Sequence, residues 1–262
     1  MRELNDWIKL FRPPLLILGF LASFSLMYYT GKWGSLESIL ILLSIGFGNM
    51  YFNLMNEIMD VRQDRINKPW KPLPSRKIDI MVAREISDYL LLLTLTLVLI
   101  LIILDRFYLI AIIGFIGGYV YNVFSRRDII GNVALCTTYT VAAYMSSYPY
   151  LLDFAVAFGL TTMAFNIGVQ IQDMEADKIA GVKTIPLQIG SGNSRILAFI
   201  ILSITFLLSF ESNIPYITKV VFFGILLSIL IPIFFDRYYE ICIRCLARLL
   251  MIMMFISLIF VG

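Results

Sequence analysis

Runs of apolar residues, each close to the length that crosses a bilayer, recur along the whole chain and are separated by short polar segments. A helix needs about 20 predominantly apolar residues to cross the hydrocarbon core. The runs lack the alternation of a membrane β-barrel, so they predict helices, which satisfy their own backbone hydrogen bonds in lipid. The predicted spans, nine in all, lie at about 14–30, 37–59, 82–104, 107–124, 129–148, 151–172, 194–210, 216–235 and 241–261.

The composition supports an integral membrane protein. Of the 262 residues, 60% are hydrophobic and 15% are charged, and the net charge is +3; about 25% of the residues of a soluble domain are charged. The polar loops are too short for a second domain, so one transmembrane domain is expected over residues 1–262. The first apolar run is long and lacks a small-residue cleavage site, so no cleavable signal peptide is expected.

The basic residues predict the orientation of the chain. If the N-terminus is cytoplasmic, only Lys32, Arg106 and Lys219 of the 21 lysines and arginines fall outside. Such an excess of positive charge on cytoplasmic loops is typical of membrane proteins. We therefore expect a multi-pass protein of the cell membrane, with its N-terminus and its longest loops in the cytoplasm.

Neither histidine nor cysteine indicates a catalytic or metal-binding site in this sequence. The chain has no histidine, which excludes histidine acid–base catalysis and histidine metal ligands. Its three cysteines are Cys136, Cys242 and Cys245. The C-x-x-C pair on the last predicted helix has neither further ligands nor a thioredoxin-like context, so a structural role is expected.

A polar motif occurs twice, each time at the cytoplasmic end of an apolar run. Both copies read F-N, six residues, D, three residues, D. Positions three or four apart share one face of a helix, so the polar residues of each copy are predicted to form one stripe. The stripes are Asn53, Asn56, Asp60 and Asp64 in the first copy, and Asn166, Gln170, Asp173 and Asp177 in the second.

The carboxylates of these stripes are unfavourably placed without a cation. Like charges four residues apart repel each other on a helix, and the helix C-terminus carries a partial negative charge. Ionised groups near the membrane core are costly unless they are compensated. Carboxylate and amide oxygens suit Mg²⁺, which usually takes one or two carboxylates and completes its shell with water and substrate phosphate. The two copies are therefore predicted to face each other as half-sites for a magnesium-bound diphosphate.

Basic loops on the same predicted side favour a phosphorylated ligand. The segments 61–79, 121–127 and 174–194 carry lysines and arginines that could hold free phosphate oxygens. Simpler interpretations exist: a single D-x-x-x-D is usually a solvated helix end or a salt-bridge partner for a nearby arginine, and a basic loop can face anionic lipid. The helix-aligned repeat favours the metal site, whereas Trp70 suits an interfacial anchor as well as a substrate contact.

These motifs together resemble a known family. Asn56-Glu57-x-x-Asp60-x-x-x-Asp64 resembles N-D-x-x-D-x-x-x-D, the first signature of the UbiA superfamily of intramembrane prenyltransferases. The segment from Arg65 to Ser75 is similar to the family stretch D-x-x-N-x-P-x-R-P-x-P-S-G. The second signature is matched by Asp173-Met-Glu175-Ala-Asp177 with Gly181, Thr184, Pro186 and Gly190, and the family's Y-S-x-x-L-K-R by Tyr121-Asn-Val-Phe-Ser-Arg126-Arg127.

The chain departs from the family pattern at a few positions. Glu57 stands where aspartate is usual, Lys71 replaces the arginine of R-P-x-P, and Arg76 replaces the glycine after the serine. Asn122 and Ser125 depart from the pattern of the third motif. These departures affect the predictions about the loops and the acceptor more than the prediction of diphosphate chemistry.

The resemblance implies an all-α integral membrane bundle of nine helices around a central cavity that opens to lipid. It implies transfer of a polyprenyl group from its diphosphate, with Asp60, Asp64, Asp173 and Asp177 as the catalytic residues. The predicted Mg²⁺ ligands are Asn56, Asp60, Asp64, Asp173 and Asp177. The predicted substrate-binding residues are Asn53, Asn56, Lys68, Tyr121, Arg126, Arg127, Asn166, Gln170 and Lys178.

The acceptor is less sharply specified. The second motif is similar to that of archaeal members that attach a second geranylgeranyl chain to geranylgeranylglyceryl phosphate, which makes this lipid the favoured acceptor. Aromatic acceptors, as in quinone synthesis, are the alternative. A secondary transporter or lipid carrier would also fit intramembrane carboxylates and a repeat, but the acidic residues lie at helix ends rather than at midplane breaks. The expected partners are a polyprenyl diphosphate, a prenyl acceptor and the bilayer, with no nucleic acid; chain length and oligomeric state stay open.

Overall fold

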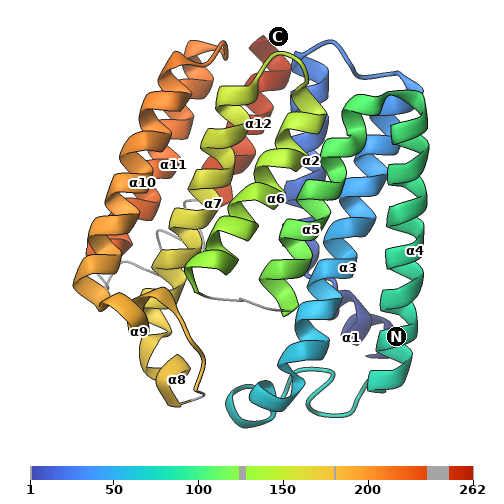
Figure 1. Ribbon diagram of the computed structural model, residues 1–262, viewed down its shortest axis with the longest axis vertical. Coiled ribbons are helices and arrows are strands. Elements are labelled where there is room, and N and C mark those ends of the chain that lie inside the picture. The colour runs from blue at the N-terminus through green and yellow to red at the C-terminus, as the bar shows by residue number, and fades with distance from the viewer. Residues whose placement is uncertain (1, 124–127, 180, 235–247, 262) are drawn as a thin grey trace. The chain divides into compact units, whose positions relative to one another are not determined.

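The computed structural model describes residues 2–123, 128–179, 181–234 and 248–261, and all regular structure in these ranges is helical (Figure 1). Six helices there are long and apolar enough to cross a membrane. These candidate spans are Leu36–Arg62, Ile80–Leu104, Arg106–Val123, Ile129–Ser147, Leu152–Gln172 and Ser191–Glu211. The prediction of an all-helical, multi-pass membrane protein is confirmed.

The other three predicted spans are represented by shorter helices. Leu16–Tyr29 and Tyr216–Ile231 are apolar but below the length of a full span. The last predicted span, 241–261, lies partly outside the described residues, and its described helix is α12 (Arg248–Val261). The count of nine spans therefore stays a prediction.

The contacts divide the chain into two compact units, and each unit contains one copy of the repeated motif. The first unit comprises residues 1–20 and 34–109. Its helices are α1 (Arg2–Leu10), the first part of α2 (Pro13–Tyr29), α3 (Leu36–Asn67), α4 (Ile80–Leu104) and the 3₁₀ helix η1 (Arg106–Leu109). Helix α3 packs along α4, and α1 contacts α3.

The second unit comprises residues 21–33 and 110–262. Besides α12 and the end of α2, it contains α5 (Ile110–Val123), α6 (Ile129–Ser147), α7 (Leu152–Gln172), α8 (Met174–Ile179), α9 (Ile185–Ile189), α10 (Ser191–Glu211) and α11 (Tyr216–Phe234). Helix α7 is its centre, since it packs against α6, α10 and α11. Phe154 of α7 lies fully buried beside Phe222, with ring centroids 5.6 Å apart.

Helix α3 is longer than the sequence pattern predicted. The segment 61–79 was expected to be a loop, but the helix continues to Asn67. It ends there because Pro69 disfavours helical backbone at the preceding residue, and Lys68 has left the helical conformation, with φ −141° and ψ 57°. At 1.5 Å per residue the 32-residue helix is about 48 Å long, which exceeds the hydrocarbon thickness of about 30 Å. The helix is therefore long enough for its polar end to lie beyond the hydrocarbon core.

The segment 174–194 is also not a simple loop. The short helices α8 and α9 lie at the end of α7 (Figure 1), and α10 begins at Ser191. Gly190 between α9 and α10 has φ 85°, a left-handed conformation that glycine adopts without strain. The chain thus folds back against the C-terminal end of α7, where the second copy of the motif lies.

Candidate active site

The first copy of the motif places three carboxylates within the buried face of α3. Glu57, Asp60 and Asp64 are 4%, 9% and 6% exposed. They follow one another at intervals of three and four residues, so the helix turns all of them to one side. The predicted stripe is confirmed here as one continuous helical face. Three carboxylates withdrawn from water require positive charge close by.

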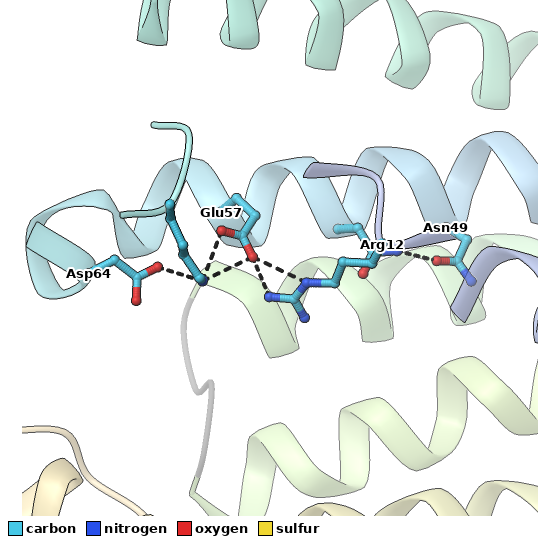
Figure 2. Close-up of polar contacts among 6 residues, drawn as sticks. Arg12, Asn49, Glu57 and Asp64 are labelled. Carbon is cyan, nitrogen blue, oxygen red and sulfur yellow. Dashed lines mark hydrogen bonds and ion pairs between the residues drawn. The ribbon is translucent and has the colours of Figure 1, made fainter. Parts of the chain in front are cut away.

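Two cations from distant parts of the sequence supply that charge. Arg12, between α1 and α2, donates from Nε to Glu57 Oε1 at 3.2 Å and also from Nη2 to the same oxygen (Figure 2). The Lys71 ammonium lies 2.9 Å from Glu57 Oε2 and 2.7 Å from Asp64 Oδ2. Lys71 therefore bridges two carboxylates that are seven residues apart on α3. Hydrogen bonds to ionised groups of this kind are stronger than neutral ones.

The segment that carries Lys71 is folded, although it has no long helix. Its backbone turns back on itself through bonds from Ser75 N to Lys71 O (3.0 Å) and from Lys77 N to Pro72 O (3.0 Å). Leu73 and Ile78 are buried, and their burial anchors the segment to the rest of the protein. The segment ends at Asp79, which caps α4 by accepting from Met81 N at 2.7 Å. This local structure places the Lys71 side chain over the carboxylates of α3.

Asparagine side chains extend the polar face of α3 toward the N-terminus of the helix, away from the carboxylates. Asn53 Nδ2 donates to Asn49 Oδ1 at 2.5 Å, one helical turn earlier (Figure 2). Asn53 and Asn56 are half-buried. The side of α3 that bears the motif is thus polar over about four turns, from Asn49 to Asp64.

The second copy of the motif is organised by Asn132 of α6, which the sequence did not single out. Asn132 is fully buried and its Oδ1 accepts from Asn166 Nδ2 at 2.8 Å and from Gln170 Nε2 at 3.4 Å. Its own amide donates to Asp128 O at 2.8 Å. Asp128 in turn caps α6 by accepting from Gly131 N. Asn132 therefore ties the first two polar residues of this copy to the start of α6.

Gln170 connects the second copy to the segment that follows it. Its Oε1 accepts from the backbone N–H of Ile185 at 3.2 Å. Both ends of the buried Gln170 amide are thereby used, since Nε2 donates to Asn132. Thr184, which precedes Ile185, is fully buried, and its Oγ1 has no hydrogen-bond partner within the described residues. The motif glutamine thus holds α9 against α7.

The two aspartates of the second copy do not share one environment. Helix α7 ends at Gln172, and Asp173 is its C-cap residue, with φ −86° and ψ 3°. Asp173 is exposed, whereas Asp177 of α8 is 2% exposed. The expectation of a stripe on one uninterrupted helix was wrong for this copy. The backbone bond from Asp177 N to Asp173 O, at 2.8 Å, still holds the two residues one turn apart.

The remaining predicted ligand residues are less constrained. Lys68, at the end of α3, and Lys178 of α8 are exposed, and Tyr121 of α5 is half-buried. Trp70 is also exposed, at 70%. Arg126 and Arg127 lie outside the described residues, as do Cys242 and Cys245.

The donor set of the first copy fits a magnesium ion. Within the described residues no three Cys, His, Asp or Glu side chains form a preformed metal cluster. Mg²⁺ does not need one, because it is usually held by one or two carboxylates together with water and substrate phosphate. Lys71 shows that the face of α3 accommodates a cation between two carboxylate oxygens. Asp60 and Asp64 therefore suit this metal in number and in chemistry.

The ion pairs and hydrogen bonds of four residues in these sites were not predicted. Arg12 was counted only as a basic residue, and Lys71 only as a basic residue of the segment 61–79 that replaces the arginine of R-P-x-P, because their distance from Glu57 along the sequence hides the ion pairs. Asn49 is one turn before the motif, and its spacing to Asn53 would have extended the stripe. No spacing in the sequence points to Asn132, since its role depends on the packing of α6 against α7.

Comparison with known proteins identifies the family. A model described as the UbiA prenyltransferase family matches residues 15–259. The chain belongs to this family. The family resemblance noted from the sequence is thereby confirmed, and with it the class of a membrane-bound prenyltransferase.

Three curated relatives share one name. The chain is similar to the digeranylgeranylglyceryl phosphate synthase of Methanocaldococcus jannaschii, at 32% identity over 76% of this chain and 69% of the relative. The enzyme of the same name from Methanosphaera stadtmanae is 30% identical over 79% and 77% of the two chains. The one from Sulfolobus acidocaldarius is 28% identical over 62% of this chain and 60% of the relative.

Solved structures show the same fold. A UbiA homolog from Archaeoglobus fulgidus bound to GPP and Mg²⁺ superposes with a TM-score of 0.71 at 21% identity, and the match covers 97% of this chain and 99% of that one. The apo UbiA homolog from Aeropyrum pernix has a TM-score of 0.66 at 15% identity, with 93% and 94% covered. The membrane-helical fold of this UbiA family member is therefore shared along nearly its whole length.

Proposed function

We propose that this UbiA family member transfers a polyprenyl group, best matched by geranylgeranyl, from its diphosphate to geranylgeranylglyceryl phosphate, with Mg²⁺ as cofactor. The observation that carries the proposal is the buried carboxylate face of α3, where Asp60 and Asp64 lie at the end of a membrane span with a cation between two of its oxygens. The name shared by the curated relatives supports the acceptor, and the UbiA homologs with bound GPP, DMAPP and Mg²⁺ support the donor and the metal.

The reaction exchanges one C–O bond for another. The bond between the allylic C1 of the prenyl chain and the diphosphate oxygen breaks, and diphosphate leaves with the electron pair. The acceptor hydroxyl oxygen bonds to C1, and its proton passes to the released diphosphate or to water. Bound magnesium would supply positive charge that stabilises the leaving diphosphate.

The protein residues have distinct tasks in this proposal. Asp60, Asp64, Asp173 and Asp177 hold the metal-bound diphosphate, as the resemblance to the family signatures implies, with the Asn56 amide as a further ligand. Lys68, Lys178, Arg126 and Arg127 hold free phosphate oxygens, and Tyr121, Asn53, Asn166 and Gln170 line the head-group site. Positive charge placed beforehand at the leaving group lowers the barrier, because it is already oriented when the bond breaks.

The proposal includes the predicted membrane arrangement. The chain is taken as one domain, residues 1–262, with nine spans around a central cavity that shields the allylic cation from water. The N-terminus and the basic segments face the cytoplasm of the cell membrane, as the distribution of lysine and arginine predicts.

The test is a transfer assay on the purified chain in lipid nanodiscs. Labelled geranylgeranyl diphosphate is supplied with Mg²⁺ and, in turn, geranylgeranylglyceryl phosphate or an aromatic acceptor, and both product and released diphosphate are measured. Asp60→Asn and Asp64→Asn are expected to lower kcat/KM at least about 100-fold, since they remove charge that acts in the transition state. Asp88→Asn, an exposed aspartate of α4, is the matched control and is expected to keep wild-type activity.

The outcomes separate the candidate functions. Product with the aromatic acceptor alone would replace the proposed acceptor but keep the transferase. Movement of intact prenyl diphosphate across the bilayer, without release of diphosphate, would instead support the carrier alternative. Full activity of Asp60→Asn and Asp64→Asn would remove the first copy of the motif from the active site.

A further inference from the structure

The Lys71 ammonium lies among carboxylate oxygens of α3, one of which belongs to the proposed metal ligand Asp64. Its Nζ is 2.7 Å from Asp64 Oδ2, 2.9 Å from Glu57 Oε2 and 3.2 Å from Glu57 Oε1. Three short contacts use all three donors of an ammonium group. Lys71 therefore uses all its donors on these two carboxylates, and a metal ion bound to Asp64 Oδ2 would lie beside the ammonium group.

The local charge balance also disfavours simultaneous occupancy by Lys71 and a divalent ion. Glu57, Asp60 and Asp64 carry three formal negative charges, and Arg12 and Lys71 carry two positive ones. A divalent cation added to this cluster would bring two more positive charges beside an ammonium and a guanidinium. In a partly buried site the repulsion between close like charges is only weakly screened. One of the two side-chain cations is therefore expected to leave when the metal binds.

Lys71 is the one that competes for the metal ligands. The two partners of Glu57 differ in their contacts: Arg12 bonds to Glu57 Oε1, whereas Lys71 also contacts Asp64. The Lys71 side chain is 23% exposed, so its four-carbon stem has a route to solvent. Leu73 and Ile78 are buried and pin the backbone of the segment. Release would then proceed by rotation of the side chain rather than by movement of the whole segment.

We propose that Lys71 is an exchangeable internal cation, which holds the first half-site closed in the absence of metal and is displaced from Asp64 when Mg²⁺ binds. Glu57, kept in place by Arg12, remains the fixed counter-charge of the cluster during the exchange. The inference rests on the proposed function, because it assigns Asp64 to the metal. It adds that Lys71 neutralises the carboxylates when no metal is bound. Binding of Mg²⁺ is then coupled to release of this one side chain.

The exchange can be followed by the chemical reactivity of the lysine. The full-length protein in nanodiscs is treated briefly with an acetylating reagent, with and without Mg²⁺ and in the absence of any diphosphate, and the modified lysines are quantified by mass spectrometry. Lys71 is expected to react at least about 3-fold faster with Mg²⁺, because an ammonium released from two carboxylates is more accessible. Lys77, an exposed neighbour in the same segment, serves as the internal control and is expected to react equally under both conditions.

A substitution tests the competition directly. Lys71→Met keeps the length of the side chain and removes its charge, so Mg²⁺ binding measured calorimetrically without substrate is expected to tighten at least about 5-fold. Lys77→Met removes the same charge outside the cluster and is expected to change the affinity less than about 2-fold.

The results distinguish this inference from the function on which it rests. If wild-type protein binds Mg²⁺ but Lys71 reactivity does not change, or if Lys71→Met and Lys77→Met have equal affinities, the exchange is refuted while the transferase proposal stands. If Mg²⁺ binds neither alone nor with inorganic pyrophosphate, the metal assignment itself is wrong.

Discussion

Arg12 donates two hydrogen bonds to one oxygen of Glu57, a residue 45 positions further along the chain. The pair joins the start of α2 to the polar end of α3, and Glu57 is 4% exposed there. Arg12 itself has φ 50°, an unfavourable left-handed conformation for a non-glycine residue. The ion pair therefore stabilises a strained connection beside the predicted metal ligands.

Neutralising Glu57 is expected to destabilise the first unit. Glu57→Gln leaves Arg12 and Lys71 without their shared counter-charge, and a free-energy cost of about 2 kcal/mol is expected, less than for a fully buried pair because both cations are partly exposed. Denaturation in detergent micelles measures the change. Glu85→Gln, at an exposed position of α4, is the matched control, and equal stability of the two variants would contradict a structural role for the pair.

The amide cluster at Asn132 gives a second prediction. Asn132→Leu preserves the volume but leaves the amides of Asn166 and Gln170 without their acceptor in a buried site. We expect a loss of about 2 kcal/mol in the free energy of unfolding and a lower kcat/KM in the transfer assay, because both amides lose their orientation. Asn193→Leu, at an exposed position of α10, is the control and is expected to stay within about 0.5 kcal/mol of the wild type. A neutral Asn132→Leu variant would show that the cluster does not position the second motif.

Backbone strain at Arg76 gives a third prediction. This residue occupies the position at which the family pattern has glycine, and its φ of 58° is the left-handed conformation that glycine tolerates best. Arg76→Gly is therefore expected to stabilise the protein by up to about 1 kcal/mol, provided that relief of strain exceeds the greater entropy of the unfolded chain. Lys77→Gly, one residue later and without a positive φ, should be destabilising, and thermal unfolding of the two variants checks the opposite signs.

Close packing of α6 and α7 gives a fourth prediction. A Cβ atom on Gly159 would lie 2.6 Å from the backbone oxygen of Cys136 and would also collide with Thr140. Gly159→Ala must therefore separate the two helices, at a cost of about 1–3 kcal/mol. Because Asn132 and Asn166 lie on the same two helices, kcat/KM should fall as well. Gly192→Ala, whose added Cβ has no neighbour within 4 Å, should leave both the free energy of unfolding and kcat/KM unchanged.

Much of the first half-site followed from the spacing of residues along one helix. Asp60 and Asp64 are close to each other because they are four residues apart on α3, which is a local property that the sequence states directly. The interruption of α7 at Asp173 was missed. The polar sequence after Gln172 does not exclude a helix, and the break is accompanied by the tertiary contacts of α8 and α9 with α7.

By itself, the sequence determined the all-helical membrane class, the two carboxylate motifs and the family, because hydrophobic length and helical spacing are local quantities. The tertiary structure decided which groups neutralise and orient those motifs. Arg12 and Lys71 reach Glu57 from two different segments, and Asn132 reaches Asn166 from another helix. Hydrogen bonds and ion pairs act over a few ångströms of space, and only the folding of the chain brings such distant positions within that range.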